Sequence, residues 1–194
     1  MLFRSIALGI FWFFTTRLAT ALTAGAIIFY VFVYTVGLKR RTSQNIVWGG
    51  IAGCFPVVIG WSAITNSISW TSVFFFLLIF FWTPPHFWAL AIKYRDDYSA
   101  AGIPMLPSVA PIKKVARQIW LYSLAMFLFS FATLWSATAP IWSYGIATAL
   151  AIFFALLLPG LEGKNGEKIA LRIFHGSITY LSLFSILLVV IAFV

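Results

Sequence analysis

The chain has only four acidic residues, and two of them, Asp96 and Asp97, are adjacent. They follow a long apolar stretch and lie beside Lys93 and Arg95. Mg²⁺ usually takes one or two protein carboxylates and completes its shell with water and substrate phosphate. The pair therefore predicts a magnesium site that holds a diphosphate. The alternative, an ordinary solvated loop, stays open on the residues alone.

A basic cluster of Lys39, Arg40 and Arg41 follows Tyr34 at the end of another apolar run. Arginine forks pair with phosphate oxygens in a bidentate way, and lysine supplies a point charge. The cluster therefore predicts a phosphate-binding loop. The same charges are also what a topology signal at a membrane surface requires, and both interpretations can hold together.

His86 comes directly after Pro84-Pro85 in an apolar stretch. Proline removes a backbone donor, and a broken helix is tolerated inside a membrane where it lines a cavity. An ionisable residue at such depth is a functional hypothesis by default, and neutral imidazole can bind iron. The alternative is a hydrogen-bonded packing histidine. Trp82 and Trp88 flank it and either line a pocket for a flat or isoprenoid ligand or merely pack.

The elements that must position these residues are membrane helices. The chain of 194 residues is 62% hydrophobic and 9% charged, whereas a soluble domain carries about 25% charged residues. The net charge of +9 would suggest nucleic-acid binding, but no basic run lies in a soluble stretch, so basic loops at a membrane surface are favoured. The lone Cys54 excludes an internal disulfide and a multi-cysteine metal site.

Apolar runs of about 20 residues are long enough to cross a bilayer. We expect an all-α, polytopic transmembrane helix bundle with about seven spans, forming a single domain over residues 1–194. The fourth span should be interrupted at Pro84-Pro85, and Lys93 to Lys114 should form a long loop. The predicted spans are 3–16 (short for a full crossing), 18–38, 46–64, 70–92, 118–138, 141–159 and 173–194.

The loop charges predict the orientation of this bundle. Alternate numbering of the loops assigns twelve basic residues to one side and Arg17 alone to the other. Excess Lys and Arg marks the cytoplasmic side. The N-terminus and the loop with Asp96 and Asp97 are therefore expected in the cytoplasm, and the C-terminus outside. The location would be the inner or plasma membrane of a cell, or the mitochondrial inner membrane in a eukaryote.

Several runs together resemble the protoheme IX farnesyltransferases, or haem O synthases, a family of UbiA-type intramembrane prenyltransferases. The resemblance covers essentially the whole chain, and its two most specific runs are PPHFWAL and AGIPMLP. The runs that carry it are YTVGLKRRT (34–42), NIVWGGIAG (45–53), GW (60–61), WTPPHFWALA (82–91), DY (97–98) and AGIPMLP (101–107).

The resemblance implies a bundle of nine helices that transfers a farnesyl group from farnesyl diphosphate to a vinyl group of haem B, giving haem O for haem A biosynthesis. It implies Mg²⁺ as cofactor. The implied partners are haem B, farnesyl diphosphate, the lipid bilayer and a haem A synthase or terminal oxidase assembly, without nucleic acid. The implied site is Asp96, Asp97 and His86 as catalytic residues, Asp96 and Asp97 on the metal, Lys39, Arg40, Lys93 and Tyr34 on the diphosphate, and His86, Trp82 and Trp88 on the haem.

One departure from the family pattern affects the expected function. The family carries a first aspartate-rich motif after its second helix, but no Asp or Glu precedes Lys39 here. We therefore expect a chain without the first two helices and that motif. Two alternatives stay open: a non-catalytic haem-binding membrane fragment, and a quinone-pathway prenyltransferase of the UbiA type. A transporter is disfavoured, because its two halves should show matching broken helices and only one break is evident.

Overall fold

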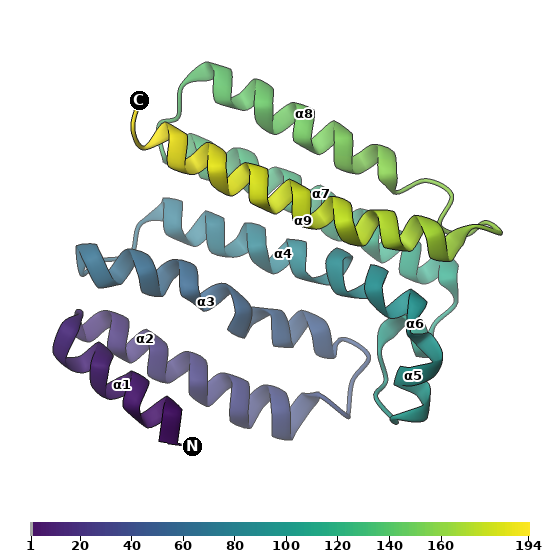
Figure 1. Ribbon diagram of the computed structural model, residues 1–194, viewed down its shortest axis with the longest axis horizontal. Helices are drawn as coiled ribbons and strands as arrows, with labels where there is room; N and C mark the ends of the chain where they lie inside the picture. The colour runs from purple at the N-terminus through teal and green to yellow at the C-terminus, as the bar shows by residue number, and fades with distance from the viewer. Residues whose placement is uncertain (1) are drawn as a thin grey trace.

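The computed structural model describes the backbone of residues 2–194 and the side chains of residues 5–194, and every regular element in that range is a helix. The predicted all-α fold is confirmed. Figure 1 shows the helices as a layered bundle with their axes roughly aligned. They are α1 (Leu2–Phe14), α2 (Arg17–Ile28) with its π-helical continuation η1 (Phe29–Leu38), α3 (Asn45–Thr65), α4 (Trp70–Lys93), α5 (Arg95–Ala100), α6 (Leu106–Val109), α7 (Ile112–Ser136), α8 (Ile141–Leu157) and α9 (Gly166–Ile191).

Five helical segments in the described range are long and apolar enough to cross a membrane. They are α2 with η1, α3, α4, α7 and α9. The other two expected spans are present as apolar helices that are shorter, in α8 and in the described part of α1. Proline explains the shortness of α8, since the helix starts after Pro140 and ends at Leu157, just before Pro159. The membrane bundle is confirmed, with two of the seven segments below full length.

Pro84 and Pro85 do not interrupt α4, so the predicted break is wrong. The helix runs without a gap from Trp70 to Lys93. Both prolines are buried, and the Thr83 hydroxyl donates a hydrogen bond of 2.8 Å to the carbonyl of Ile79 one turn earlier. α4 contacts α3, α7 and α9 and is the central helix of the bundle. Packing on three sides therefore holds the helical path against the local cost of the prolines.

The predicted loop from Lys93 to Lys114 is also more ordered than expected. It contains α5 and α6, joined by a turn at Gly102, whose φ is +63°. Only glycine adopts this conformation without a steric cost, which explains the residue. Leu106 and Pro107 of α6 are buried, and α6 contacts both α4 and α7. The turn therefore folds the segment back onto the bundle.

The loops fall into two groups at opposite ends of the bundle. The η1–α3 loop, α5, α6 and the α8–α9 loop lie at one end, while the α3–α4 and α7–α8 turns lie with the C-terminus at the other (Figure 1). We call the first group the basic end, because it carries Lys39, Lys93, Lys113 and Lys164. This is the two-sided arrangement that the loop charges predicted; which side faces the cytoplasm stays a prediction. The side chain of Arg4 lies outside the described residues.

Close packing of α8 on α9 depends on Gly176. A Cβ there would collide with Leu157 and touch Phe154. We expect Gly176→Ala to be less stable than the control below by about 1 kcal/mol, the low end of overpacking costs, because the terminal methyl of Leu157 has to move aside, and to unfold at a lower temperature in detergent. Gly145→Ala is the matched control, because no other atom lies within 4 Å of where its new Cβ would stand and alanine is the better helix former. Equal unfolding temperatures for the two variants would contradict this packing.

Candidate functional site

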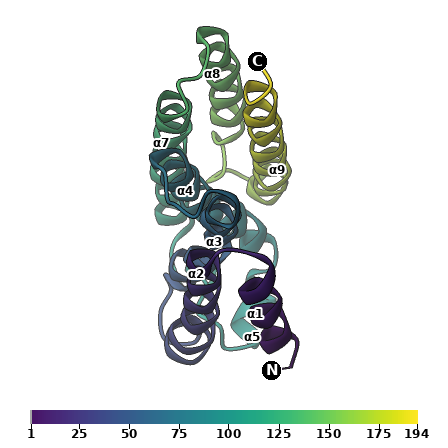
Figure 2. The same cartoon turned by 90° about the vertical axis from the view of Figure 1, so that its left-hand side faces the viewer.

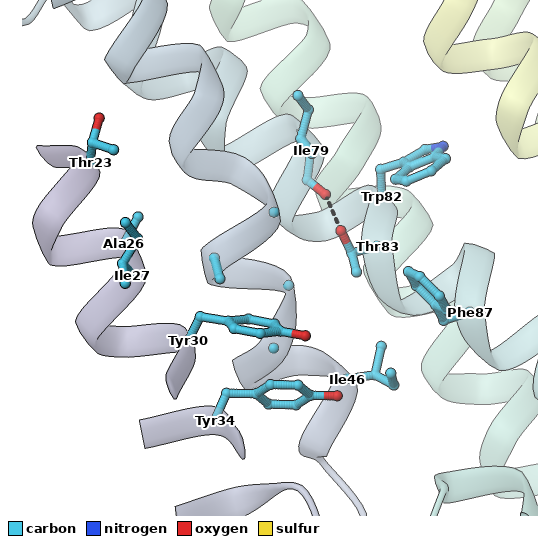
Figure 3. Close-up of a pocket in the computed structure, with 14 residues that line it drawn as sticks. Thr23, Ala26, Ile27, Tyr30, Tyr34, Ile46, Ile79, Trp82, Thr83 and Phe87 are labelled. Atoms are coloured by element: carbon cyan, nitrogen blue, oxygen red, sulfur yellow. Dashed lines mark hydrogen bonds between the residues drawn. The ribbon is translucent and has the colours of Figure 1, made fainter. Parts of the chain in front are cut away.

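A cavity of about 580 Å³ opens between α2–η1, α3 and α4. Its volume is typical of small-molecule sites, which occupy about 300–1,000 Å³. Figure 3 shows Tyr30 and Tyr34 reaching across it toward α4. It is lined by Thr23, Ala26, Ile27, Tyr30, Tyr34, Ile46, Gly49, Gly50, Ala52, Gly53, Ile79, Trp82, Thr83 and Phe87.

Small residues on α3 make room for this cavity. A Cβ at Gly49 would lie 2.6 Å from Cε2 of Tyr34. A Cβ at Gly50 would lie 3.0 Å from Cγ2 of Thr83. Gly53, one turn further along, has no such atom within 4 Å and faces the open volume. The glycines therefore let η1 and α4 approach α3 on two sides and leave a hollow between them.

Tyr30 and Tyr34 form the aromatic wall on η1. Their ring centroids are 5.5 Å apart with planes at 39°. In this segment hydrogen bonds span five residues, as in the 2.8 Å bond from the Lys39 amide to the Tyr34 carbonyl. The two rings lie on one face, as their four-residue spacing allows, and both hydroxyls point toward α4 (Figure 3). Such π-helical segments occur frequently at functional sites.

Trp82 lies between the cavity and His86. It lines the cavity, and its ring stacks on the imidazole with centroids 4.3 Å apart and planes at 18°. Its Nε1 donates a 2.7 Å hydrogen bond to the carbonyl of Ser177 on α9. The stack with His86 and the hydrogen bond to Ser177 therefore fix Trp82, which separates the cavity from the imidazole of His86.

His86 is held in the interface of α4 and α9 and does not line the cavity. It is 9% exposed, and Phe174 stacks on its second face at 4.5 Å. Its Nδ1 lies 2.8 Å from the Ser177 hydroxyl, which itself donates to the Phe174 carbonyl at 2.6 Å. The hydroxyl proton is thus committed, so Nδ1–H donates to Ser177 and Nε2 keeps its lone pair. This geometry suits a packing histidine, and it also leaves one nitrogen able to accept a ligand.

Trp88 is placed away from both features. It is 0% exposed and packs edge-on against Tyr122 of α7, with centroids 5.3 Å apart. Its Nε1 has no hydrogen-bond partner among the described residues. Trp82 and Trp88 are six residues apart, which puts them on different faces of one helix. The structure therefore does not bring Trp88 together with Trp82 and His86, and we leave it out of the proposed site.

The charged candidates lie together at the basic end. Asp96 and Asp97 are exposed in the first turn of α5, and this helix lies at the same end as the η1–α3 loop (Figure 1). Figure 2 looks along the bundle and shows α5 behind α1. Lys93 is exposed at the end of α4. Asn45 holds the η1–α3 loop in place, because its Nδ2 donates a 3.1 Å hydrogen bond to the Lys39 carbonyl. Basic and acidic groups from three segments thus surround one end of the bundle.

The donor set fits a magnesium ion that also binds phosphate. No group of three or more His, Cys, Asp or Glu side chains gathers within the described part of the chain. Asp96 and Asp97 are neighbours on a helix, where side chains one residue apart do not face each other. They can supply one or two oxygens, and Mg²⁺ takes the remainder from water and substrate phosphates.

Sequence reasoning missed several residues of this site. Tyr30 and Thr83 carry no motif of their own, although the four-residue spacing of Tyr30 and Tyr34 on an apolar helix was a usable signal. The glycines of α3 lie in the NIVWGGIAG run (45–53), which carries no signal of a cavity by itself. Ser177 and Phe174 reach His86 from another helix, so no local pattern could have predicted them.

Comparison with known proteins identifies the class. The chain belongs to the UbiA prenyltransferase family, whose family model matches residues 1–178. Similar proteins named protoheme IX farnesyltransferase are known from several bacteria. The chain is 52% identical to the Frankia alni protein (89% of the chain, 61% of the relative), 51% to that of Mycolicibacterium smegmatis (88% and 56%) and 44% to that of Renibacterium salmoninarum (97% and 61%).

The chain thus spans about three-fifths of the length of these curated relatives. No solved structure matches it.

Proposed function

We propose that this chain forms the prenyl-binding part of a haem O synthase, which transfers a farnesyl group from farnesyl diphosphate to haem B. The observation that carries the proposal is the cavity: an apolar and aromatic hollow inside a membrane bundle, beside a charged end with Lys39, Arg40, Lys93 and the two aspartates. A farnesyl chain needs the first environment and a diphosphate the second. The names of the similar proteins supply the acceptor.

The diphosphate would bind at the basic end. Arg40 offers a fork for two phosphate oxygens, and Lys39 and Lys93 add point charges. Asp96 and Asp97 would hold Mg²⁺, which when bound neutralises charge on the departing diphosphate. Tyr34 lies at the cavity wall near the same loop and would donate a hydrogen bond. These groups favour cleavage of the bond between the farnesyl carbon and the diphosphate oxygen.

The farnesyl chain would occupy the cavity. Departure of the diphosphate gives an allylic cation, and the faces of Tyr34 and Trp82 attract positive charge through their ring quadrupoles. The apolar lining from Ile27 and Ile79 excludes water that would capture the cation too early. A haem vinyl carbon then attacks the cation, and water completes the hydroxyethylfarnesyl group.

Haem would be positioned by the Trp82–His86–Phe174 stack. The lone pair on His86 Nε2 suits an iron ligand, and the Ser177 hydroxyl keeps the imidazole in that tautomer. Trp82 contacts both the cavity and His86, so it connects the two substrate sites.

Turnover in membranes containing the chain tests this proposal. Haem B, farnesyl diphosphate and Mg²⁺ are added, and haem O is sought by mass-resolved chromatography with pyrophosphate measured in parallel. Chelator-sensitive haem O is the expected product. Haem uptake without pyrophosphate release would instead support a haem-binding protein, and product from an aromatic acid acceptor would support a quinone-pathway enzyme.

The length of the cavity gives a separate prediction. Gly53→Leu should fold, because nothing lies within 4 Å of its Cβ position, but its side chain would fill the hollow. We expect binding of farnesyl diphosphate to weaken about tenfold, while the shorter geranyl diphosphate is affected less. Gly60→Leu is the control on the same helix, with equal space around it and outside the cavity lining. Equal chain-length preference in both variants would contradict the assignment.

A further inference from the structure

A second pocket lies at the basic end, on the side of the bundle away from the prenyl cavity. It has a volume of about 740 Å³ and lies between the first turns of α7 and the segment that follows α8. It shares no lining residue with the prenyl cavity. Its lining is Pro111, Lys113, Lys114, Ala116, Arg117, Trp120, Leu158, Pro159, Gly160, Leu161 and Glu162.

The side chains that line this pocket carry a net positive charge. Its lining holds three basic residues, Lys113, Lys114 and Arg117, and one acid, Glu162. Lys113 and Arg117 are four residues apart, and Lys114 and Arg117 are three apart, so Arg117 neighbours both lysines on the surface of α7. They also lie in the first turns of a 25-residue helix, whose N-terminal backbone adds positive potential. The pocket is therefore built for an anion.

The pocket also has an apolar side, and its position is that of a membrane interface. Arg117 is the last charged residue before an uncharged stretch that extends to Leu161. Trp120 follows one turn inward and is partly exposed, as expected of an aromatic residue at headgroup depth. Leu158 and Leu161 complete the apolar wall. A ligand here would meet cations at one end and hydrocarbon at the other.

We propose that this pocket binds the phosphate headgroup of an anionic glycerophospholipid. Basic pockets between transmembrane helices on the positively charged side are suited to such headgroups. Arg117 would hold two phosphate oxygens in its fork, the lysines would add charge, and Trp120 with the leucines would contact the glycerol and acyl region. The bound lipid would hold the α8–α9 loop against α7, because the pocket wall comes from both.

The lipid preference of the unmodified protein is the first test. The purified protein is titrated in detergent with phosphatidylglycerol, phosphatidylcholine or inorganic phosphate, and its unfolding temperature and retained lipid (by native mass spectrometry) are measured. Phosphatidylglycerol should be retained and should raise the unfolding temperature, since a ligand of the native state stabilises it. Equal effects of the two lipids would overturn the proposal. Inorganic phosphate that stabilises as well as phosphatidylglycerol would replace the lipid by a soluble phosphate ligand.

A charge-matched pair of triple variants locates the effect. Lys113→Gln, Lys114→Gln and Arg117→Gln together should weaken phosphatidylglycerol binding about a hundredfold, at roughly fivefold per basic residue. The control removes three other cations of the same end that do not line the pocket: Lys164→Gln, Lys168→Gln and Arg172→Gln. Equal losses in both variants would mean general attraction to a basic surface and would overturn a defined pocket. Retention of wild-type affinity by the first variant would also overturn it.

Discussion

Replacing both aspartates of α5, as Asp96→Asn and Asp97→Asn, should reduce haem O formation about a thousandfold in a protein that makes this product, an effect of the size seen when charge stabilisation is removed from a transition state. Asparagine keeps the shape and removes the negative charge, so Mg²⁺ loses its protein ligands. Mg²⁺-dependent binding of farnesyl diphosphate should be lost as well. Both quantities are measured in one preparation, by product chromatography and by retention of radiolabelled farnesyl diphosphate.

The two single variants then show which carboxylate is the main ligand. Neighbouring side chains on a helix point in different directions, so we expect unequal losses from Asp96→Asn and Asp97→Asn. Glu167→Gln is the control, since Glu167 is an exposed acid in the first turn of α9 at the same end of the bundle. Wild-type turnover by the double variant would remove the pair from the site.

His86→Ala should abolish coupling to haem while leaving diphosphate binding intact. The imidazole is enclosed by Trp82 and Phe174 and lies outside the cavity lining, so its removal takes away the haem contact without opening the diphosphate end. The measurement combines haem titration by absorbance spectroscopy with binding of farnesyl diphosphate. Ser177→Ala should give an intermediate haem spectrum, because Nδ1 loses its partner and the other tautomer becomes accessible.

The second histidine is the control for that change. His175 is exposed, and its Nδ1 interacts with the carbonyl of Leu171 in its own helix at 2.8 Å. His175→Ala should bind haem and turn over as the unmodified protein does. A His86→Ala protein with a normal haem spectrum and full activity would reduce His86 to a packing residue.

Much of the fold follows from the sequence because lipid imposes simple rules. Runs of apolar residues between polar loops and proline breaks predicted seven helical segments, and all are present in the described range. The alternation of Lys39, Lys93 and Lys164 with Arg17 predicted which loops share an end. The interruption at Pro84-Pro85 was wrong, because proline affects local hydrogen bonding while burial among α3, α7 and α9 decides the path of α4.

The site was less predictable, since its walls come from separate helices. The sequence placed Trp82, His86 and Trp88 together by proximity in the chain. The structure keeps Trp82 stacked on His86, with Trp82 also on the cavity wall, but it places Trp88 in the core facing α7. Trp88 is six residues after Trp82 on α4, so its side chain projects from a different face of the helix. Tyr30 lies four residues before Tyr34 on the same helical face, but the π-helical path of η1 had no signal in the segment.

Photo-crosslinking would show whether the hollow between α2–η1, α3 and α4 holds the prenyl chain, on which the proposed function depends. A farnesyl diphosphate analogue with a photoreactive group on its last isoprene unit is irradiated with the protein and Mg²⁺, and labelled residues are mapped by mass spectrometry. We predict label on cavity residues such as Ala26, Ala52 and Ile79, lost with excess farnesyl diphosphate or chelator. Competable label confined to α7, α8 or α9 would mean that the prenyl chain binds elsewhere and would contradict the proposal.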